Sequence, residues 1–252
     1  MALEYCEFGD LYSLIEKEHG LSESFSRILF LQIVDAVSFC HASGIVHRDI
    51  KPENILIKGK DMVKLSDFGF ARKWTVGEKL STFCGSPGYA PPEILAQKPY
   101  SGPEVDLWAL GVTLYCMACG YSPFDDPNVS KVYSKVIRCK FEFPGSVSTT
   151  FRDLIANVLK IDPVQRLGLC DMQSHPWTLE RDGPVIYPKS YAEDTDRHSK
   201  EQPTASYITI NNSSFEHPKP RLVPTSEDLG PKTNNNGESS ITPKTDVQVN
   251  AV

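Results

Sequence analysis

The stretch VHRDIKPENILI, residues 46–57, decides the fold class of this chain. Its polar residues Asp49 and Asn54 lie on an irregular loop directly before a short apolar run. A second apolar run, MVKLS at 62–66, follows a polar turn and leads directly into Asp67. Two such runs joined by a short turn are typical of a β-hairpin. Folding the hairpin would bring Asn54 and Asp67, at its two ends, close together.

The polar groups of this stretch suit phosphoryl transfer with a magnesium–nucleotide. Mg²⁺ prefers hard oxygen ligands and takes one or two protein groups while phosphates complete its shell, which makes Asn54 and Asp67 candidate ligands. Asp49 could accept the proton of an incoming hydroxyl group. Lys51 could neutralise charge on the phosphoryl group. Each signal is weak alone, because His-Arg-Asp is often a surface turn and Asp-Phe-Gly also occurs by chance.

Together, the motifs of the chain follow one another in a fixed order that is far more specific. They are HRDIKPEN (47–54), DFG (67–69), GSPGYAPPE (85–93), DLWALGV (106–112) and DPVQRLG (162–168). In this order they resemble the catalytic domain of eukaryotic protein kinases over residues 1–178. Lys51 and the GSPGY sequence resemble serine/threonine rather than tyrosine kinases. The sequences around them are similar to the calcium/calmodulin-kinase-like group, and within it to AMP-activated-kinase-related and testis-specific serine kinases.

The resemblance implies a role for each matching residue. Asp49 would be the catalytic base, Lys51 would contact the γ-phosphate of ATP, and Asn54 and Asp67 would hold Mg²⁺. The reaction implied is transfer of the γ-phosphoryl group of ATP to serine or threonine hydroxyls of protein substrates.

The resemblance also implies structural roles. His47 and Phe68 would stack in an internal hydrophobic spine anchored on Asp106. Glu93 would pair with Arg166 and tie the activation segment to the helical region; separate surface charges are the alternative. The family's Ala-Pro-Glu reads Pro-Pro-Glu here, a mild departure because Glu93 is kept.

Regulation and substrate binding are implied by five further residues. Thr82 matches the activation-loop phosphosite that an upstream activating kinase would modify, and Arg48 would receive the phosphate; a plain loop residue is the alternative. Ser86 matches a residue that faces the substrate and helps to hold the catalytic loop. Glu53 and Asp10 match acids that meet arginines of the substrate in relatives, or else they are solvated surface acids.

The first residues resemble the hinge of a kinase. In LEYCEFGDLYSLI, Leu3 falls at the gatekeeper position, and the backbone of Glu4 and Cys6 would meet the adenine ring, with Leu56 as the floor of the pocket. We therefore expect the sequence to begin inside the hinge strand. The three glycines before residue 47 cannot form Gly-x-Gly-x-x-Gly, and Lys17, in a polar helix end, cannot be the phosphate-binding strand lysine.

Composition limits the other classes of function. The 252 residues carry a formal charge of −6 and no long basic run, which disfavours nucleic-acid binding. No apolar run approaches the roughly 18 residues of a membrane span, and no signal-peptide pattern is present. The seven cysteines form no framework, so we expect a reduced, cytoplasmic chain with nuclear access possible. The Cys-x-x-Cys pair at 116–119 lies in an apolar run and indicates buried core cysteines rather than a zinc or redox pair.

The fold class predicted is mainly α with a small β-hairpin, like the large lobe of a kinase. Helical periodicity and caps predict helices near residues 10–18, 22–44, 102–120, 128–139 and 148–160. From 179 to 252 the chain is rich in Pro, Ser, Thr and Asn, which predicts a mostly disordered tail.

The sequence therefore predicts a serine/threonine protein kinase that uses ATP and Mg²⁺, with impaired activity in this chain. Two alternatives remain at this point. One is a non-catalytic interaction module that binds through the helical lobe. The other is that the sequence is an incomplete version of an ordinary kinase.

Overall fold

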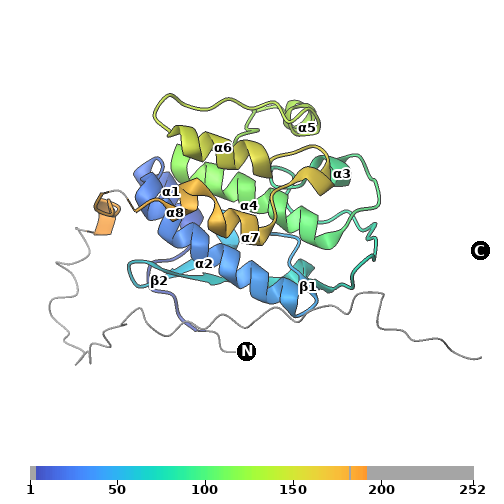
Figure 1. The fold of residues 1–252 in the computed structure, drawn as a ribbon, viewed down its shortest axis with the longest axis horizontal. Helices are drawn as coiled ribbons and strands as arrows, with labels where there is room; N and C mark the ends of the chain where they lie inside the picture. Colours follow the sequence, from blue (N-terminus) through green and yellow to red (C-terminus); the bar gives the residue numbers. More distant parts are fainter. Residues whose placement is uncertain (1–3, 182, 192–252) are drawn as a thin grey trace, which may run out of the picture. The chain divides into compact units, whose positions relative to one another are not determined.

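Helix α4, Gly102–Cys119, is the centre of the fold and is buried from Val105 to Met117. The structure is a computed structural model, and it describes residues 4–181 and 183–191. The sequence of α4 is apolar nearly all round, so it must be covered on every side. Helices α2, Glu23–Ala42, and α6, Thr149–Val158, pack against it (Figure 1). The helix-rich fold with little β structure agrees with the predicted class.

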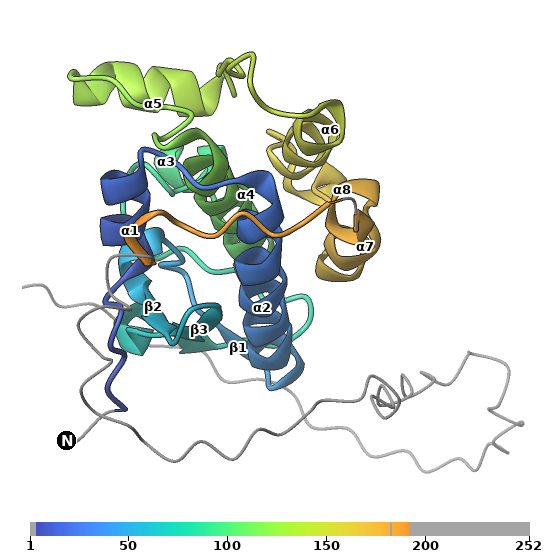
Figure 2. The same ribbon diagram turned by 90° about the vertical axis from the view of Figure 1, so that its left-hand side faces the viewer.

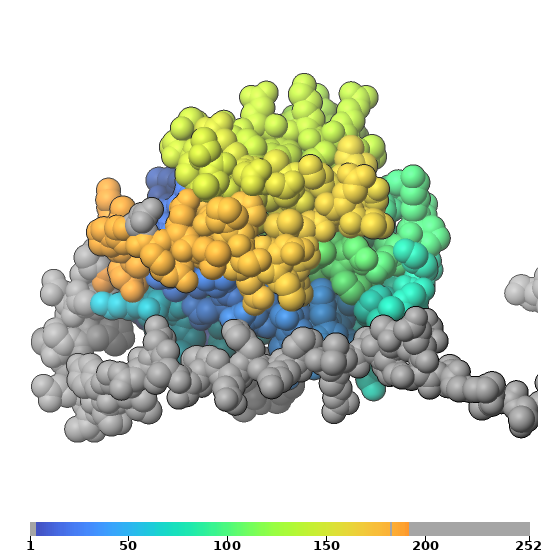
Figure 3. Space-filling view, in the orientation of Figure 1, coloured from blue at the N-terminus to red at the C-terminus, as the bar shows by residue number. Residues whose placement is uncertain are grey.

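The remaining helices surround this core. They are α1 (Leu11–Glu18), α3 (Pro92–Leu95), α5 (Val129–Ile137), α7 (Leu169–Ser174) and α8 (Pro176–Leu179). Short 3-10 turns cover Pro52–Asn54, Phe68–Phe70 and Pro163–Gln165. Helices α7 and α8 lie beside α2 and cover part of it (Figure 3). The longer elements coincide with the predicted helices, whereas α3, α7 and α8 are too short to show a period.

Side-chain caps explain where several helices begin. The Ser22 hydroxyl accepts from the Phe25 amide at 3.2 Å, and the Ser148 hydroxyl accepts from the Phe151 amide at 3.1 Å. Each bond satisfies one of the backbone amides that have no hydrogen-bond partner within the first turn of the helix. Gly120 ends α4 with φ 82°, and a Cβ there would lie 2.5 Å from the His19 carbonyl oxygen. The ends of α1 and α4 can approach this closely only with glycine at that position.

Two small antiparallel ladders complete the fold. Strands β2 (Ile55–Lys58) and β3 (Met62–Leu65) form the predicted hairpin, with Ile55 opposite Leu65. Strands β1 (Ile45–Val46) and β4 (Arg72–Lys73) form a second pair that the sequence did not reveal, because two-residue strands show no alternation.

Residues 183–191 run from α8 across the start of α2 to α1 (Figure 2). The Ile186 carbonyl accepts from Ser22 Oγ at 2.7 Å, and the buried Tyr191 ring lies 5.0 Å from that of Phe8. The predicted tail therefore begins with a packed segment, which we call the strap. Residues 192–252 lie outside the described residues.

Two features bear on the function classes that the sequence disfavoured. We expected no apolar run of the length of a membrane span, yet by length and mean hydropathy α2 would pass as one. Half of this apolar stretch is buried inside the fold, as in the core helix of a soluble protein. Burial raises the pKa of the Cys116 and Cys119 thiols to about 12. Groups of three or more metal-binding side chains are absent from the described ranges. Cys116 is a buried core residue, as expected, whereas Cys119 is only partly buried against the core.

Candidate active site

Asp106, at the start of the buried part of α4, fixes the loop before β2. Its carboxylate oxygens accept from the His47 amide at 2.9 Å and the Arg48 amide at 2.7 Å. The His41 ring nitrogen lies 2.8 Å from Oδ2 of the same carboxylate. Asp106 is fully buried. A buried carboxylate must be satisfied by such donors, so the loop conformation and the charge of Asp106 stabilise each other.

The Asp49 carboxylate is held from two sides. Its Oδ1 accepts from the amide and the hydroxyl of Ser86, both at 3.1 Å. Its Oδ2 accepts from Lys51 Nζ at 3.0 Å and from Asn54 Nδ2 at 2.9 Å. Asp49 is only 3% exposed, so these donors replace the water that a free carboxylate would bind. The structure thus places three other predicted site residues, Ser86, Lys51 and Asn54, around the Asp49 carboxylate.

Lys51 contacts both Asp49 and Ser86. Its ammonium group also donates to the Ser86 hydroxyl at 2.8 Å. The hydroxyl of Ser86 therefore lies between the ammonium of Lys51 and the carboxylate of Asp49. A hydroxyl group can thus sit within reach of both a proton acceptor and a positive charge.

Asn54 and Asp67 lie at the two ends of the β2–β3 hairpin. The Asn54 carbonyl accepts from the amide of Ser66 at 2.8 Å, which places Asp67 one residue beyond the paired end. The side-chain Nδ2 of Asn54 donates to the backbone carbonyl and to the carboxylate of Asp49. The side-chain oxygen of Asn54 is therefore left for another partner. One carboxylate and one amide oxygen are the hard donors that Mg²⁺ accepts, so this pair fits the ion.

The backbone around Asp67 is unusual. Asp67 adopts a left-handed conformation with φ 57°, and its Oδ1 accepts from the amide of Gly69 at 3.1 Å. The next side chain, Phe68, packs edge-on against His47 with ring centroids 4.8 Å apart. The His47 Nε2 atom lies 3.0 Å from the Ser66 carbonyl oxygen. The predicted stack therefore exists, although Phe68 itself is 47% exposed.

Glu93 and Arg166 form a bidentate ion pair, with both N–O distances 2.7 Å. The side chain of Arg166 is fully buried, and its guanidinium lies 5.1 Å from the Trp108 ring centroid. The alternative of two separate surface charges does not hold. The pair connects the segment after residue 85 to the loop that follows α6.

The segment before Glu93 is attached through Tyr100 to the loop of residues 47–54, the predicted catalytic loop. The Tyr100 hydroxyl donates to the Thr82 carbonyl at 2.8 Å and accepts from Arg48 Nη1 at 3.1 Å. The side chain of Thr82 is exposed, and Arg48 reaches it only through Tyr100 in this arrangement. Gly85 has φ 91°, and a Cβ there would lie 2.7 Å from the Arg48 carbonyl oxygen. Only glycine allows the two loops to approach this closely.

The first described residues lie along β2. The Ile57 amide donates to the Gly9 carbonyl at 2.8 Å, which places Leu56, half-buried, beside this segment. The Glu4 carboxylate pairs with Lys58 and with Lys64, and these two lysines hold its pKa below the usual range. The Cys6 carbonyl accepts from the Gly9 amide at 3.3 Å. Leu3, the predicted gatekeeper, lies outside the described residues.

The two acids predicted for substrate binding differ in their surroundings. The Asp10 carboxylate caps α1, accepting from the amide of Ser13 at 2.8 Å and from its hydroxyl at 3.1 Å. Glu53 is exposed on the catalytic loop, and its charge contributes to a raised pKa of the Tyr89 phenol, for which burial is the first cause. Asp10 therefore has a structural task of its own, whereas Glu53 faces solvent beside Tyr89.

Sequence reasoning missed three residues of this site. They are His41, Ser66 and Tyr100. His41 is the second-to-last residue of a long helix, and Tyr100 follows a polar turn, so neither lies in a motif that marks it. Ser66 stands next to Asp67 and could have been inferred from the hairpin register alone.

A buried carboxylate held beside a lysine, with two hard oxygen donors at the adjoining hairpin, is an arrangement that phosphoryl-transfer sites use. The family model described as the protein kinase domain matches residues 1–178. The chain belongs to the protein kinase family.

Several kinases are similar over the same region. Serine/threonine protein kinase OSK3 of Oryza sativa is 42% identical over 177 residues, which cover 70% of this chain and 35% of the relative. The SNF-related serine/threonine-protein kinase of Rattus norvegicus is 45% identical over 179 residues, 70% of this chain and 24% of the relative. Maternal embryonic leucine zipper kinase of Xenopus tropicalis is 43% identical over 182 residues, 71% and 28% respectively.

The predicted resemblance to serine/threonine kinases is confirmed by these relatives. The chain spans about a third or less of the length of each of them.

Proposed function

We propose that this chain carries the catalytic and substrate-facing part of a serine/threonine protein kinase. The reaction is transfer of the γ-phosphoryl group of ATP to serine or threonine hydroxyls of protein substrates. The observation that carries the proposal is the Asp49 carboxylate, buried and held by Ser86, Lys51 and Asn54 at 2.9–3.1 Å. Acidic side chains are rarely buried this way without a role that needs a fixed orientation.

In this reaction Asp49 orients the acceptor hydroxyl and takes its proton. The Ser86 hydroxyl, which donates to Asp49 and accepts from Lys51, shows how a hydroxyl group is positioned there. Lys51 supplies positive charge where the phosphoryl group passes, and Asn54 and Asp67 would hold Mg²⁺. When bound, Mg²⁺ neutralises phosphate charge. Fixed charges and orientation supply most of the catalysis of such transfers.

Thr82 is proposed as a phosphosite of an upstream kinase. It is exposed, and its carbonyl is tied through Tyr100 to the guanidinium of Arg48. A phosphate on Thr82 would find Arg48 close by, and a charge-assisted pair there would order the segment relative to Asp49.

We propose further that the 252-residue polypeptide, purified alone, transfers phosphate slowly. The side of the site formed by Asp67, Phe68 and Phe70 is exposed, so water competes for the phosphates there.

An assay with radiolabelled ATP, Mg²⁺ and an arginine-containing serine peptide tests both proposals. We expect incorporation well below the roughly 1–100 s⁻¹ typical of kinases, and its loss in Asp49→Asn, which keeps the side-chain shape but removes the base. Equal incorporation by the parent polypeptide and Asp49→Asn would contradict the assignment of Asp49. Turnover within the typical range would contradict the impairment alone.

A second candidate function, a non-catalytic interaction module, is favoured by one observation. Apolar side chains near the hairpin are exposed: Tyr5 by 80%, Met62 by 47%, Phe68 by 47% and Phe70 by 45%. Exposed apolar groups gathered at one place often mark a surface that another protein covers. The Asp49→Asn comparison separates the two functions, because binding through this surface does not need the base.

A further inference from the structure

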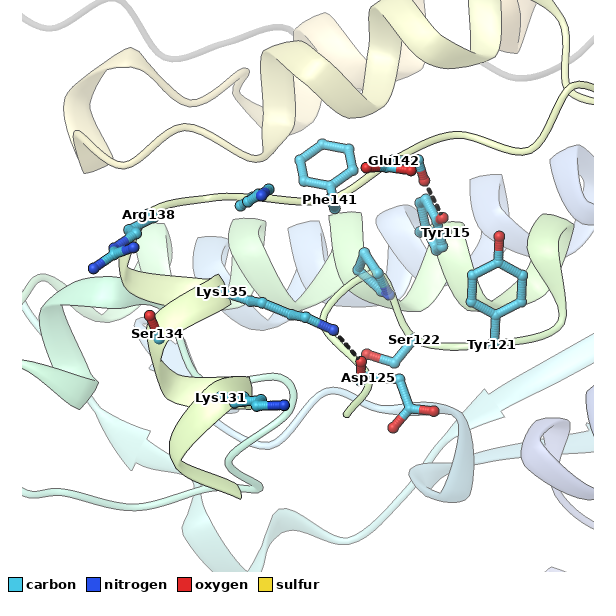
Figure 4. A pocket seen from close by; sticks show the side chains of 12 residues that line it. Tyr115, Tyr121, Ser122, Asp125, Lys131, Ser134, Lys135, Arg138, Phe141 and Glu142 are labelled. Carbon is cyan, nitrogen blue, oxygen red and sulfur yellow. Dashed lines mark hydrogen bonds between the residues drawn. The ribbon is translucent and has the colours of Figure 1, made fainter. Parts of the chain in front are cut away.

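A groove of about 680 Å³ lies between α4, α5 and the loops at both ends of α5 (Figure 4). Residues of α5 form one side, and Tyr115 and Tyr121 form the side opposite. This volume is within the range of about 300–1,000 Å³ that ligand sites occupy. The roles argued so far use none of the residues that line it.

Positive charge is concentrated on the α5 side. The groove is lined by Lys131, Lys135, Arg138 and Lys140. Lys135 is already engaged, because its Nζ donates to the Asp125 carbonyl at 2.5 Å and lies 3.2 Å from Asp126 Oδ2.

Two of the other cations remain open to a ligand. Arg138 and Lys140 are exposed, and no side-chain hydrogen bond or ion pair of theirs exists within the described ranges 4–181 and 183–191. These two exposed cations of the lining can therefore receive anionic groups without first giving up a partner.

The opposite side of the groove is rigid and aromatic. The Tyr115 hydroxyl donates to the Glu142 carbonyl at 2.6 Å, and its ring lies within 6.0 Å of those of Phe141 and Phe143. Tyr121, 49% exposed, packs edge-on against Tyr115 at 5.8 Å. Such a surface accepts the apolar parts of a bound chain while the cations receive its charges.

The groove is also continuous with the neighbourhood of the catalytic loop. A second hollow of about 260 Å³ shares Tyr121, Ser122 and Asp125 with it and extends to Pro52 and Tyr89. Pro52 directly follows Lys51, and Tyr89 is three residues after Ser86. A polypeptide whose hydroxyl reaches Asp49 can therefore continue through the second hollow into the cationic groove.

We infer that this groove binds an acidic segment of the protein substrate, at a distance from the residue that is phosphorylated. The inference rests on the proposed function for the identity of the ligand as a substrate. Asp125, Asp126 and Glu142 lie among the cations, so an unbroken phosphate backbone would meet repulsion, whereas spaced carboxylates of a peptide can alternate with them. An acidic peptide therefore fits better than a nucleic acid.

Direct binding tests the inference without any phosphoryl transfer. The probe is a fluorescein-labelled 12-residue peptide of alternating Glu and Gly with a terminal Tyr, and fluorescence anisotropy is measured with the full chain at low and high salt. A peptide with Gln in place of Glu is the matched probe. We expect the Glu peptide to bind at least about tenfold more tightly at low salt, with the difference shrinking as salt screens the charges.

Two variants locate the binding. Arg138→Gln with Lys140→Gln should weaken the Glu peptide about fivefold or more, since exposed ion pairs each contribute up to about fivefold. Lys60→Gln, which removes an exposed cation from the distant β2–β3 turn, should leave binding unchanged. Equal binding of the Glu and Gln peptides, or equal weakening by Lys60→Gln, would overturn the inference. So would tighter binding of a single-stranded oligonucleotide than of the Glu peptide.

The same experiment separates this inference from the proposed kinase function. If the Glu peptide binds through Arg138 and Lys140 but no phosphate is transferred in the radiolabel assay, the inference about the groove is supported and the catalytic proposal is contradicted. If phosphate is transferred and the Glu peptide does not bind, the catalytic proposal is supported and the inference about the groove is contradicted.

Discussion

Two residues 73 positions apart connect the segment around Ser86 to the loop that follows α6. Glu93 and Arg166 are both buried, and besides the ion pair the guanidinium donates to the carbonyls of Lys160 and Glu104. A buried pair is costly to desolvate but costlier still to break, because one charge is then left without a partner. At the scale of single residues, this pair therefore decides whether the segment around Ser86 stays in place beside Asp49.

Replacing Glu93 by Ala is expected to lower the free energy of unfolding by about 3–5 kcal/mol. Lys64→Ala is the matched control, since it breaks only the exposed pair with Glu4 at 3.4 Å and should cost about 1 kcal/mol or less. Urea denaturation of the three proteins, followed by circular dichroism, measures both values. A loss for Glu93→Ala no larger than that for Lys64→Ala would show that Arg166 finds another partner.

At the scale of elements, periodicity and caps made the long helices predictable. Helix α2 has apolar residues at helical spacing after Ser22, and α4 is apolar nearly throughout, so both could be inferred from the sequence. The strap could not, because its order depends on distant partners. The amides of Lys189 and Ser190 donate to the Glu18 carboxylate at 3.1 and 2.8 Å. A Pro- and Ser-containing segment gives no local sign of such contacts.

The candidate site was predictable to a similar degree. The order of the motifs indicated that Asp49, Lys51, Asn54 and Ser86 belong together, and the structure brings them together. The link from Arg48 through Tyr100 to Thr82 was not predictable. It depends on where the loop after α3 folds back, and a single tyrosine outside any motif does not reveal that.

The strap gives a prediction of its own. Tyr191 is 5% exposed and packs on Phe8 and Phe25, so Tyr191→Ala should destabilise the fold by about 3–5 kcal/mol, as for other buried aromatic residues. Within the described residues the Tyr191 hydroxyl has no hydrogen-bond partner. Tyr191→Phe should therefore be neutral or slightly stabilising, because it removes an unsatisfied buried group.

Thermal or urea unfolding of the parent chain, Tyr191→Ala and Tyr191→Phe measures this difference. Tyr187→Ala, at a 44% exposed position of the same segment, is the control and should cost less than Tyr191→Ala. Equal stability of Tyr191→Ala and the parent would mean that the strap is not part of the folded unit in solution.

At the scale of the whole molecule, one side of the site is closed and the other is open. Asp49, Asn54 and Asp106 are buried, whereas Asp67 and Phe68 are exposed. Hydrogen bonds and charges therefore hold the proposed acceptor side in place, whereas the side proposed to meet the nucleotide is exposed to water. Exposure to water should therefore weaken nucleotide binding more than it disturbs the position of Asp49. Nucleotide affinity measures the effect on the exposed side.

The 252-residue polypeptide should bind Mg-ATP with a Kd in the millimolar range or weaker, about 4 kcal/mol or less. Leu56 is only half-buried and Asp67 is exposed to water, so each contact with the nucleotide is weakened by the high dielectric constant. At about 1 mM nucleotide, linkage then limits the added stability to about 0.4 kcal/mol. Thermal melting with and without Mg-ATP, together with calorimetry, measures this. Low-micromolar affinity that disappears in Asp67→Ala would mean instead that another segment or a second chain closes the open side, because only a covered site could hold the phosphates that tightly.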